Sequence, residues 1–198
     1  MMKFTRSAAP KCLKKYKQWG REYTRKRPSK FYWHRYQNRS VHEIVLAELE
    51  SLTANHCSFC DGYPLGAQSR QTIEHFRPKS KYPRLAYVWQ NLFLSCDVCQ
   101  NAKGENYDKK LLKPDAIGYA FNRYFKIKAK TGEIVINLAA SPDDQERAKI
   151  TLEMYDLNST VRKSSRIKQL QLKYMFKYRK RGIANDDLDN LAYRFLFI

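Results

Sequence analysis

The sequence predicts an α+β fold, with helices around a short central region rich in cysteine, histidine and asparagine. Two observations indicate this class. Apolar segments short enough for strands lie between segments with helical periodicity, and four of the five cysteines fall into two close pairs. Hydrophobic residues make up 43% of the 198 residues and aromatic residues 14%, which excludes a wholly disordered chain. At about 150 residues per domain, this length suits one small domain with extensions.

Residues 1–54 are expected to form a basic N-terminal arm followed by a lead-in helix. Residues 1–39 show no clean periodicity, so we expect one short helix there at most. Ser40, with Glu43 three positions later, has the pattern of a capping box. Apolar residues then recur at helical spacing and predict a helix over 41–53: Val41, Ile44, Val45, Leu49 and Leu52.

Residues 55–140 should contain the strands. Two short apolar stretches, Gln71–Phe76 and Leu92–Ser95, are expected to be strands within the central region 55–105. The segment 106–140 is expected to be an inserted hairpin, because two β-rich stretches flank a three-residue turn that ends in glycine. Those stretches are Tyr124–Ala129 and Glu133–Asn137, around Lys130, Thr131 and Gly132.

Residues 141–198 are expected to be helical. Ser141 and Pro142 have the types preferred at a helix start, so a helix is expected over 142–154, and a second over 159–181. Apolar residues predict a last helix that packs onto the core or onto a partner, unless the chain stops inside a longer protein: Leu188, Leu191, Ala192, Phe195 and Leu196.

The charge distribution favours an anionic partner. The net charge is +19, and residues 1–40 carry 13 Lys and Arg against the single acid Glu22, a net +12. The segment Arg162–Arg181 adds nine Lys and Arg without an acid. Aromatic residues interleave with the basic ones in the arm, a combination suited to phosphate contact and base stacking on nucleic acid. A solvated basic face, or a dock for an acidic protein, is the alternative.

The cysteines predict a structural zinc site. Cys57 and Cys60, and then Cys96 and Cys99, form two pairs with two intervening residues each, separated by 35 residues. The chain lacks an apolar stretch long enough for a membrane span or a secretion signal, so we expect a soluble protein in the reducing cytoplasm, where thiols serve as metal ligands. Two pairs favour a closed tetrahedral zinc site over two redox dithiols, and the remaining Cys12 is expected to be a structural or incidental thiol.

An adjacent acid and histidine, Glu74 and His75, lie between the two cysteine pairs. Zinc deaminases require a histidine ligand followed two residues later by a glutamate, and here the glutamate precedes the histidine, so that class is excluded. For His75 the alternatives are a structural histidine or an additional zinc ligand. His34 and His42 lack comparable context, whereas His56, beside Cys57, is the best rival zinc ligand.

The central motif resembles the HNH (ββα-metal) endonucleases. It comprises Glu74–Ser80, Tyr82-Pro83, Trp89, Asn91-Leu92, the Cys96/Cys99 pair and Asn101–Gly104. Within these endonucleases it is most similar to the PtuB-type nucleases of Septu anti-phage systems, which retron defence operons also carry. The resemblance implies a ββα-metal core at 55–105 clasped by the four-cysteine zinc site, with the hairpin insertion and the flanking helices outside it.

The resemblance also implies site roles. His75 would be the general base, and Glu74 with Asn101 would hold a catalytic Mg²⁺ or another divalent cation. Asn91 would support the loop beside His75. Lys103, with Arg77 and Lys79, would contact the nucleic-acid phosphates. Many HNH sites have Asp at the position of Glu74 and His at that of Asn101, which puts the metal preference in question.

By this resemblance the protein would be a bacterial effector nuclease, hydrolysing phosphodiester bonds in DNA or tRNA. Its expected partner is a PtuA-type ATPase, with a retron reverse transcriptase and its DNA as further candidates. The early helix and the C-terminal helix are the candidate docking surfaces. A catalytically inactive, zinc-stabilised module that binds nucleic acid or serves as an adaptor for the ATPase remains the alternative.

Overall fold

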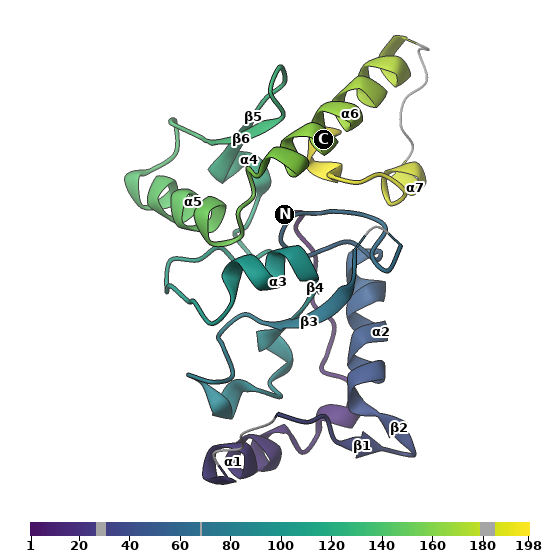
Figure 1. Ribbon diagram of the computed structural model, residues 1–198, viewed down its shortest axis with the longest axis vertical. Coiled ribbons are helices and arrows are strands. Elements are labelled where there is room, and N and C mark those ends of the chain that lie inside the picture. The colour runs from purple at the N-terminus through teal and green to yellow at the C-terminus, as the bar shows by residue number, and fades with distance from the viewer. Residues whose placement is uncertain (27–30, 68, 179–184) are drawn as a thin grey trace.

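The computed structural model describes residues 1–26, 31–67, 69–178 and 185–198. The molecule is elongated, with α1 (Tyr16–Lys26) and the small hairpin β1–β2 (Arg35–Tyr36 and Arg39–Ser40) at one end (Figure 1). A second hairpin and the long helix α6 lie at the other end, and the central strands lie between them. Within the described ranges, no helix combines the length and the apolar character needed to cross a bilayer.

The central unit consists of two strands and a short helix. Strand β3 (Gln71–His75) pairs antiparallel with β4 (Leu92–Cys96), in a register that places His75 opposite Leu92. Helix α3 (Asp97–Lys103) follows β4 directly, and the Cys96 side chain accepts a hydrogen bond from the N–H of Cys99 at its start. These are the two strands expected from the sequence, and every residue of β4 is buried.

Helix α2 (Val41–Thr53) has the bounds that its periodicity predicted and packs against β4. Ser40 caps it by accepting a hydrogen bond from the N–H of His42 at 3.2 Å. Val41, Val45 and Leu49 are completely buried. The apolar face of α2 is therefore part of the core, and this corrects the expectation that it serves as a docking surface.

The expected hairpin is β5 (Phe125–Lys128) with β6 (Glu133–Ile136), preceded by the short helix α4 (Phe121–Tyr124). Helix α5 (Pro142–Met154) begins as expected, because the Ser141 hydroxyl accepts a hydrogen bond from the N–H of Asp144. Helix α6 (Thr160–Tyr178) begins one residue later than expected, and the rest of the predicted helix to 181 lies outside the described residues.

The predicted last helix is wrong. The chain forms a single turn, α7 (Asn185–Leu188), and later a 3-10 turn, Arg194–Leu196. Tyr193 between them has a left-handed backbone with φ 56°, which a continuous helix does not allow. Phe195 is buried, with its ring stacked on that of Phe121 at 4.2 Å. The apolar C-terminal segment thus packs on the core of this chain, one of the two placements expected for it, but it does so without forming a helix.

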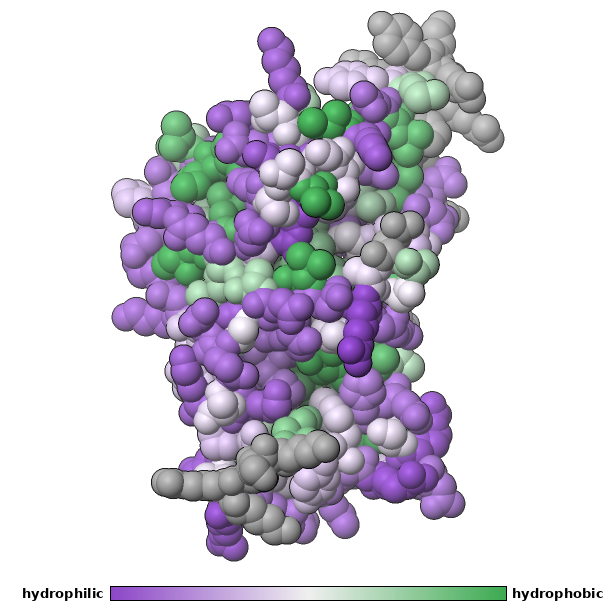
Figure 2. All heavy atoms as spheres, viewed as in Figure 1, coloured by the Kyte–Doolittle hydropathy of each residue, from purple (hydrophilic) through white to green (hydrophobic). Residues whose placement is uncertain are grey.

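Three short 3-10 helices complete the architecture: Lys11–Leu13, Pro83–Leu85 and Trp89–Asn91. The N-terminal arm packs closely: Arg6 pairs with Asp115 at 2.7 Å and donates to the carbonyl of Leu92. Hydrophilic side chains cover most of the face shown in Figure 2. Arg162 and Arg166, counted in the basic C-terminal block, are buried, so they do not add to that surface.

Candidate functional site

The four paired cysteines converge on one buried point. Cys57 and Cys60 lie in the loop after α2, Cys96 ends β4, and Cys99 is in α3. Their sulfur atoms all lie within 4.8 Å of one another, and the sulfurs of Cys60 and Cys96 are 3.8 Å apart. Tetrahedral zinc with bonds of about 2.3 Å places its sulfur ligands roughly 3.8 Å apart. The four residues therefore form a donor set that could hold a zinc ion.

Hydrogen-bond donors surround these sulfurs. Backbone N–H groups donate to three of them: Gly62 to Cys60 at 3.4 Å, Cys96 to Cys57 at 3.3 Å, and Cys99 to Cys96 at 3.3 Å. Burial raises the pKa of the Cys99 thiol well above its ordinary value, and the neighbouring sulfurs raise it further. All four sulfurs can be thiolates together only if a cation lies among them.

Arg162 contributes a charge to the cluster that the sequence did not reveal. Its Nη2 donates to the Cys99 sulfur at 3.0 Å, and its Nη1 donates to the carbonyl of Asp156 at 2.8 Å. Burial alone would lower the pKa of Arg162, but the four sulfurs, Cys99 foremost, raise it above its ordinary value. Helix α6 is thereby joined to the cysteine cluster. The two residues are 63 positions apart, and no local sequence pattern signals this contact.

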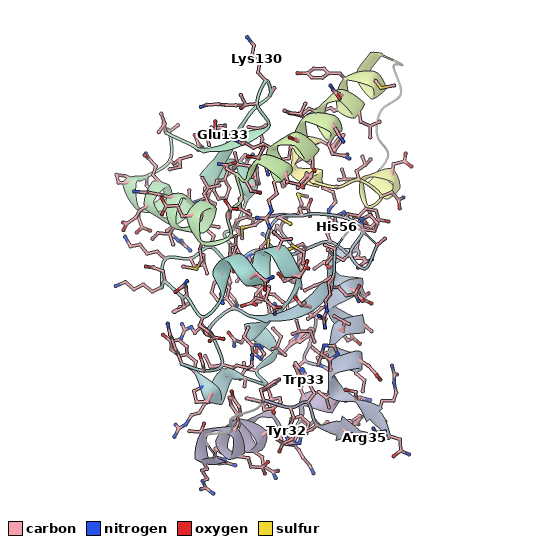
Figure 3. The ribbon with its side chains drawn as sticks, in the orientation of Figure 1. Tyr32, Trp33, Arg35, His56, Lys130 and Glu133 are labelled. Carbon is pink, nitrogen blue, oxygen red and sulfur yellow. The ribbon has the colours of Figure 1, made fainter. Side chains whose placement is uncertain are left out.

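Two other candidates lie outside the cluster. His56 is fully buried, and its ring faces the carbonyls of Thr53 and Ala54 through Nδ1 and that of Leu191 through Nε2. Figure 3 shows it where α2 ends, close to α7. Both ring nitrogens are engaged, so His56 is not a zinc ligand in this structure. Cys12 is also buried away from the four sulfurs.

A cleft of about 390 Å³ opens beside the central unit. Strand β3 supplies Glu74 and His75, and helix α3 supplies Gln100 and Asn101. The remaining lining residues are Pro78, Lys79, Gly104 and Glu105. Carboxylate and amide oxygens therefore face one space, and these are donor types that Mg²⁺ accepts. The residue types in the cleft fit a divalent cation, although these oxygens alone would not complete its coordination.

His75 is held as a neutral imidazole. Its Nε2 lies 2.9 Å from the carbonyl oxygen of Ala86, which can only accept, so Nε2 carries the proton and Nδ1 has a free lone pair. The ring of Phe31 meets it edge-on at 5.4 Å, and Trp33 stacks at 6.3 Å. Figure 3 shows Trp33 between the central unit and the end of the molecule that carries α1. Burial, with the charge of Lys79 adding to it, lowers the pKa of His75 to about 3.

Glu74 forms a buried ion pair with Lys103. The Lys103 ammonium is 2.6 Å from Glu74 Oε1 and 3.1 Å from the carbonyl oxygen of His75, and the lysine is 0% exposed. Burial raises the pKa of Glu74, and the charge of Lys103 opposes that rise. This placement corrects the expectation that Lys103 contacts phosphates, because its charged group does not reach the surface.

Asn91 fixes the loop that follows β3. Its side-chain oxygen accepts from the N–H of Arg77 at 2.8 Å, and its amide donates to the carbonyls of Arg77 at 3.0 Å and Leu85 at 3.1 Å. Arg77 is exposed and packs over the Tyr107 ring at 5.2 Å, while Lys79 is half-buried in the cleft wall.

Asn101 is exposed on α3, whereas the preceding Gln100 is half-buried and its side chain interacts with Glu74. The sequence pattern pointed to Asn101 and missed Gln100. Helical geometry was the available signal, since Gln100 and Lys103 are three positions apart and share the face that meets β3.

Comparisons with known proteins found one curated relative at a modest level of similarity. The chain is 30% identical over 92 residues to the Septu protein PtuB of Bacillus mycoides (strain KBAB4). The matched region covers 40% of this chain and 30% of the relative, so the chain spans under a third of that protein's length. No family model matches the sequence.

Proposed function

We propose that this chain is a metal-dependent HNH-type endonuclease, the nuclease component of a Septu-type bacterial defence system. The observation that carries the proposal is the state of His75. Its Nε2 is tied to the Ala86 carbonyl, which leaves Nδ1 as a proton acceptor at a cleft that Glu74 and Asn101 also line. The similarity to a Septu PtuB protein supports the assignment of this chain to a Septu-type system.

The chemistry would be hydrolysis of a phosphodiester bond. His75 Nδ1 removes a proton from a water molecule, whose oxygen bonds to phosphorus while the bond to the leaving sugar oxygen breaks. The leaving oxygen takes a proton from solvent. Lys79 and Arg77 attract the flanking phosphates, and Asn91 keeps the loop between them and His75 in place. A divalent cation held by Glu74 and Asn101 would neutralise charge developing on the reacting phosphate.

The test is cleavage by the purified protein in Mg²⁺. Duplex DNA, single-stranded DNA and total tRNA are offered separately, with and without the ATPase of the same defence system. We expect one substrate class to be cut, and His75→Ala to reduce the rate by at least about 100-fold, the size expected for loss of a general base. His42→Ala is the matched control, because it removes a histidine outside the cleft and should keep most of the activity.

Zinc must be followed in the same experiment. A chelator can remove both metals. Recovery of activity on adding Mg²⁺ is therefore tested only in samples that still contain about one zinc per chain. If the zinc-loaded protein binds nucleic acid but cuts none of the three substrates, with or without the ATPase, the binding or adaptor module becomes the better assignment.

The partners are part of the proposal. We expect the chain to co-purify with a PtuA-type ATPase when the two are co-expressed, and a retron reverse transcriptase with its DNA is a second candidate. Failure of the ATPase to co-purify at physiological salt would remove the partner assignment while leaving the cleavage test intact.

A further inference from the structure

We propose that Lys103 keeps the candidate metal site electrically neutral, so that a divalent cation binds there tightly only together with a nucleic-acid phosphate. The inference rests on the proposed function and concerns the order in which the cation and the substrate are held. It assigns Lys103 a positioning role in place of the phosphate contact expected from the sequence.

The lysine is fixed in place by its contacts. Its ammonium donates to Glu74 Oε1 at 2.6 Å, to the His75 carbonyl at 3.1 Å and to the Gly104 carbonyl at 3.4 Å. An ammonium has three protons, so these contacts use all of its donors. Because the side chain is fully buried, it cannot swing into solvent when another cation arrives.

The position of Lys103 in helix α3 places its side chain on the face of the helix that meets β3. Lys103 and Gln100 are three positions apart and share one face, and both side chains interact with Glu74. Lys103 therefore holds Oε1 of the Glu74 carboxylate from within the protein. Glu74 also lines the cleft, where it can meet a ligand.

The charges at the cleft sum to zero. Glu74 and Glu105 carry two negative charges, and Lys103 and Lys79 carry two positive charges. Sites that bind divalent cations tightly do so largely through the number of their charged ligands. A neutral site gives a dication little attraction, whereas each phosphate that enters the cleft adds one negative charge beside Glu74. The free protein should accordingly bind the cation weakly, and the nucleic-acid complex should bind it strongly.

Mn²⁺ binding to a protein that cannot cut its substrate tests this inference. In the zinc-loaded His75→Ala protein at pH 8, free Mn²⁺ is measured by electron paramagnetic resonance, with and without a 20-nucleotide single strand. A second protein carrying both Glu74→Gln and His75→Ala measures Mn²⁺ bound elsewhere, including on the oligonucleotide. We expect the oligonucleotide to tighten Mn²⁺ binding at the Glu74-dependent site by about tenfold or more, as the addition of an uncompensated negative charge would predict.

Adding Lys103→Met should tighten Mn²⁺ binding to the free protein by about tenfold and shrink the effect of the oligonucleotide. Lys109→Met, at an exposed lysine just beyond α3, is the matched control and should change neither value. Equal Mn²⁺ affinity with and without the oligonucleotide would overturn the inference, as would weaker binding by a folded Lys103→Met protein. If Lys103→Met fails to fold, equal affinity in the first comparison still overturns the inference.

The outcome is separable from that of the proposed function. Wild-type cleavage that is lost in His75→Ala, combined with Mn²⁺ binding that ignores the oligonucleotide, would keep the nuclease and discard the role of Lys103.

Discussion

Asn91 is the residue on which the backbone beside the cleft most directly depends. Asn91→Ala removes three hydrogen bonds: those to the N–H and the carbonyl of Arg77 and the one to the carbonyl of Leu85. We expect a loss of about 2–4 kcal/mol in the free energy of unfolding, measured by urea denaturation. Asn101→Ala, at an exposed asparagine of α3, should change it by less than about 0.5 kcal/mol. Equal effects of the two substitutions would contradict this role for Asn91.

Arg162 offers a second test at the level of one side chain. Arg162→Met removes the donor to the Cys99 sulfur and the hydrogen bonds to the carbonyls of Tyr155 and Asp156. Partners that support metal ligands typically contribute 10–100-fold in affinity, so zinc affinity should fall by roughly that factor. A colorimetric chelator that competes for zinc measures the change. The control is Lys168→Met, at an exposed lysine of the same helix. Unchanged zinc affinity in a folded Arg162→Met protein would show that the contact between Arg162 and the Cys99 sulfur does not contribute to zinc binding.

The sequence singled out the residues around the candidate site better than it predicted their contacts. The four cysteines are recognisable from residue type and spacing, whereas Glu74, His75 and Asn91 were singled out by the resemblance to the HNH endonucleases. The burial of Lys103 is not recognisable, because a lysine three positions beyond Gln100 reads as a surface charge until the strand it faces is known. Arg162 is harder still, since its partner is 63 positions away and no local pattern links them.

Among the elements, the hairpin β5–β6 is fixed to α6 through a glycine. Gly132 has φ +65°, and a Cβ at this position would collide with the carbonyl oxygen of Lys163. Gly132→Ala should therefore lower the free energy of unfolding by about 2 kcal/mol or more, measured by thermal or urea unfolding. Gly118→Ala is the control, because its Cβ would meet only Arg123 Nη1, at an ordinary 3.6 Å. A small effect at Gly132 would mean that the turn can move away from α6.

Elements with strong local signals were predicted well, and those decided by distant contacts were not. Helices α2 and α5 each begin at a serine cap, α2 also has a periodic apolar face, and the bounds of both match the expectation. The last predicted helix failed because Asp61 competes for its backbone. The carbonyl of Asp61 accepts from the N–H of Tyr193, and its carboxylate accepts from the N–H of Arg194. Periodicity cannot reveal a partner more than 130 positions away.

For the whole molecule, the cysteine cluster is the point at which separate parts of the chain meet. It joins the loop after α2 to β4 and α3, and through Arg162 it holds α6. Cys99→Ser should abolish stoichiometric zinc binding and the cooperative unfolding transition, since structural zinc contributes directly to folding. Cys12→Ala removes a buried cysteine away from the cluster and should retain one zinc per chain. Elemental analysis and circular dichroism measure both; a cooperative, zinc-free Cys99→Ser protein would refute the structural role.

The pairing of Asp61 with Arg194 has a consequence for how the protein is made. The two residues are 133 positions apart, and the carboxylate of Asp61 sits directly after Cys60. At about 5–20 residues per second, a ribosome needs roughly 7–27 s to travel from one to the other. During that interval Cys57 and Cys60 are present without the ion pair between Asp61 and Arg194, and α6 is synthesised only in the later part of the interval. A nascent chain thus completes the surroundings of its cysteine cluster only well after the first cysteine pair has been made.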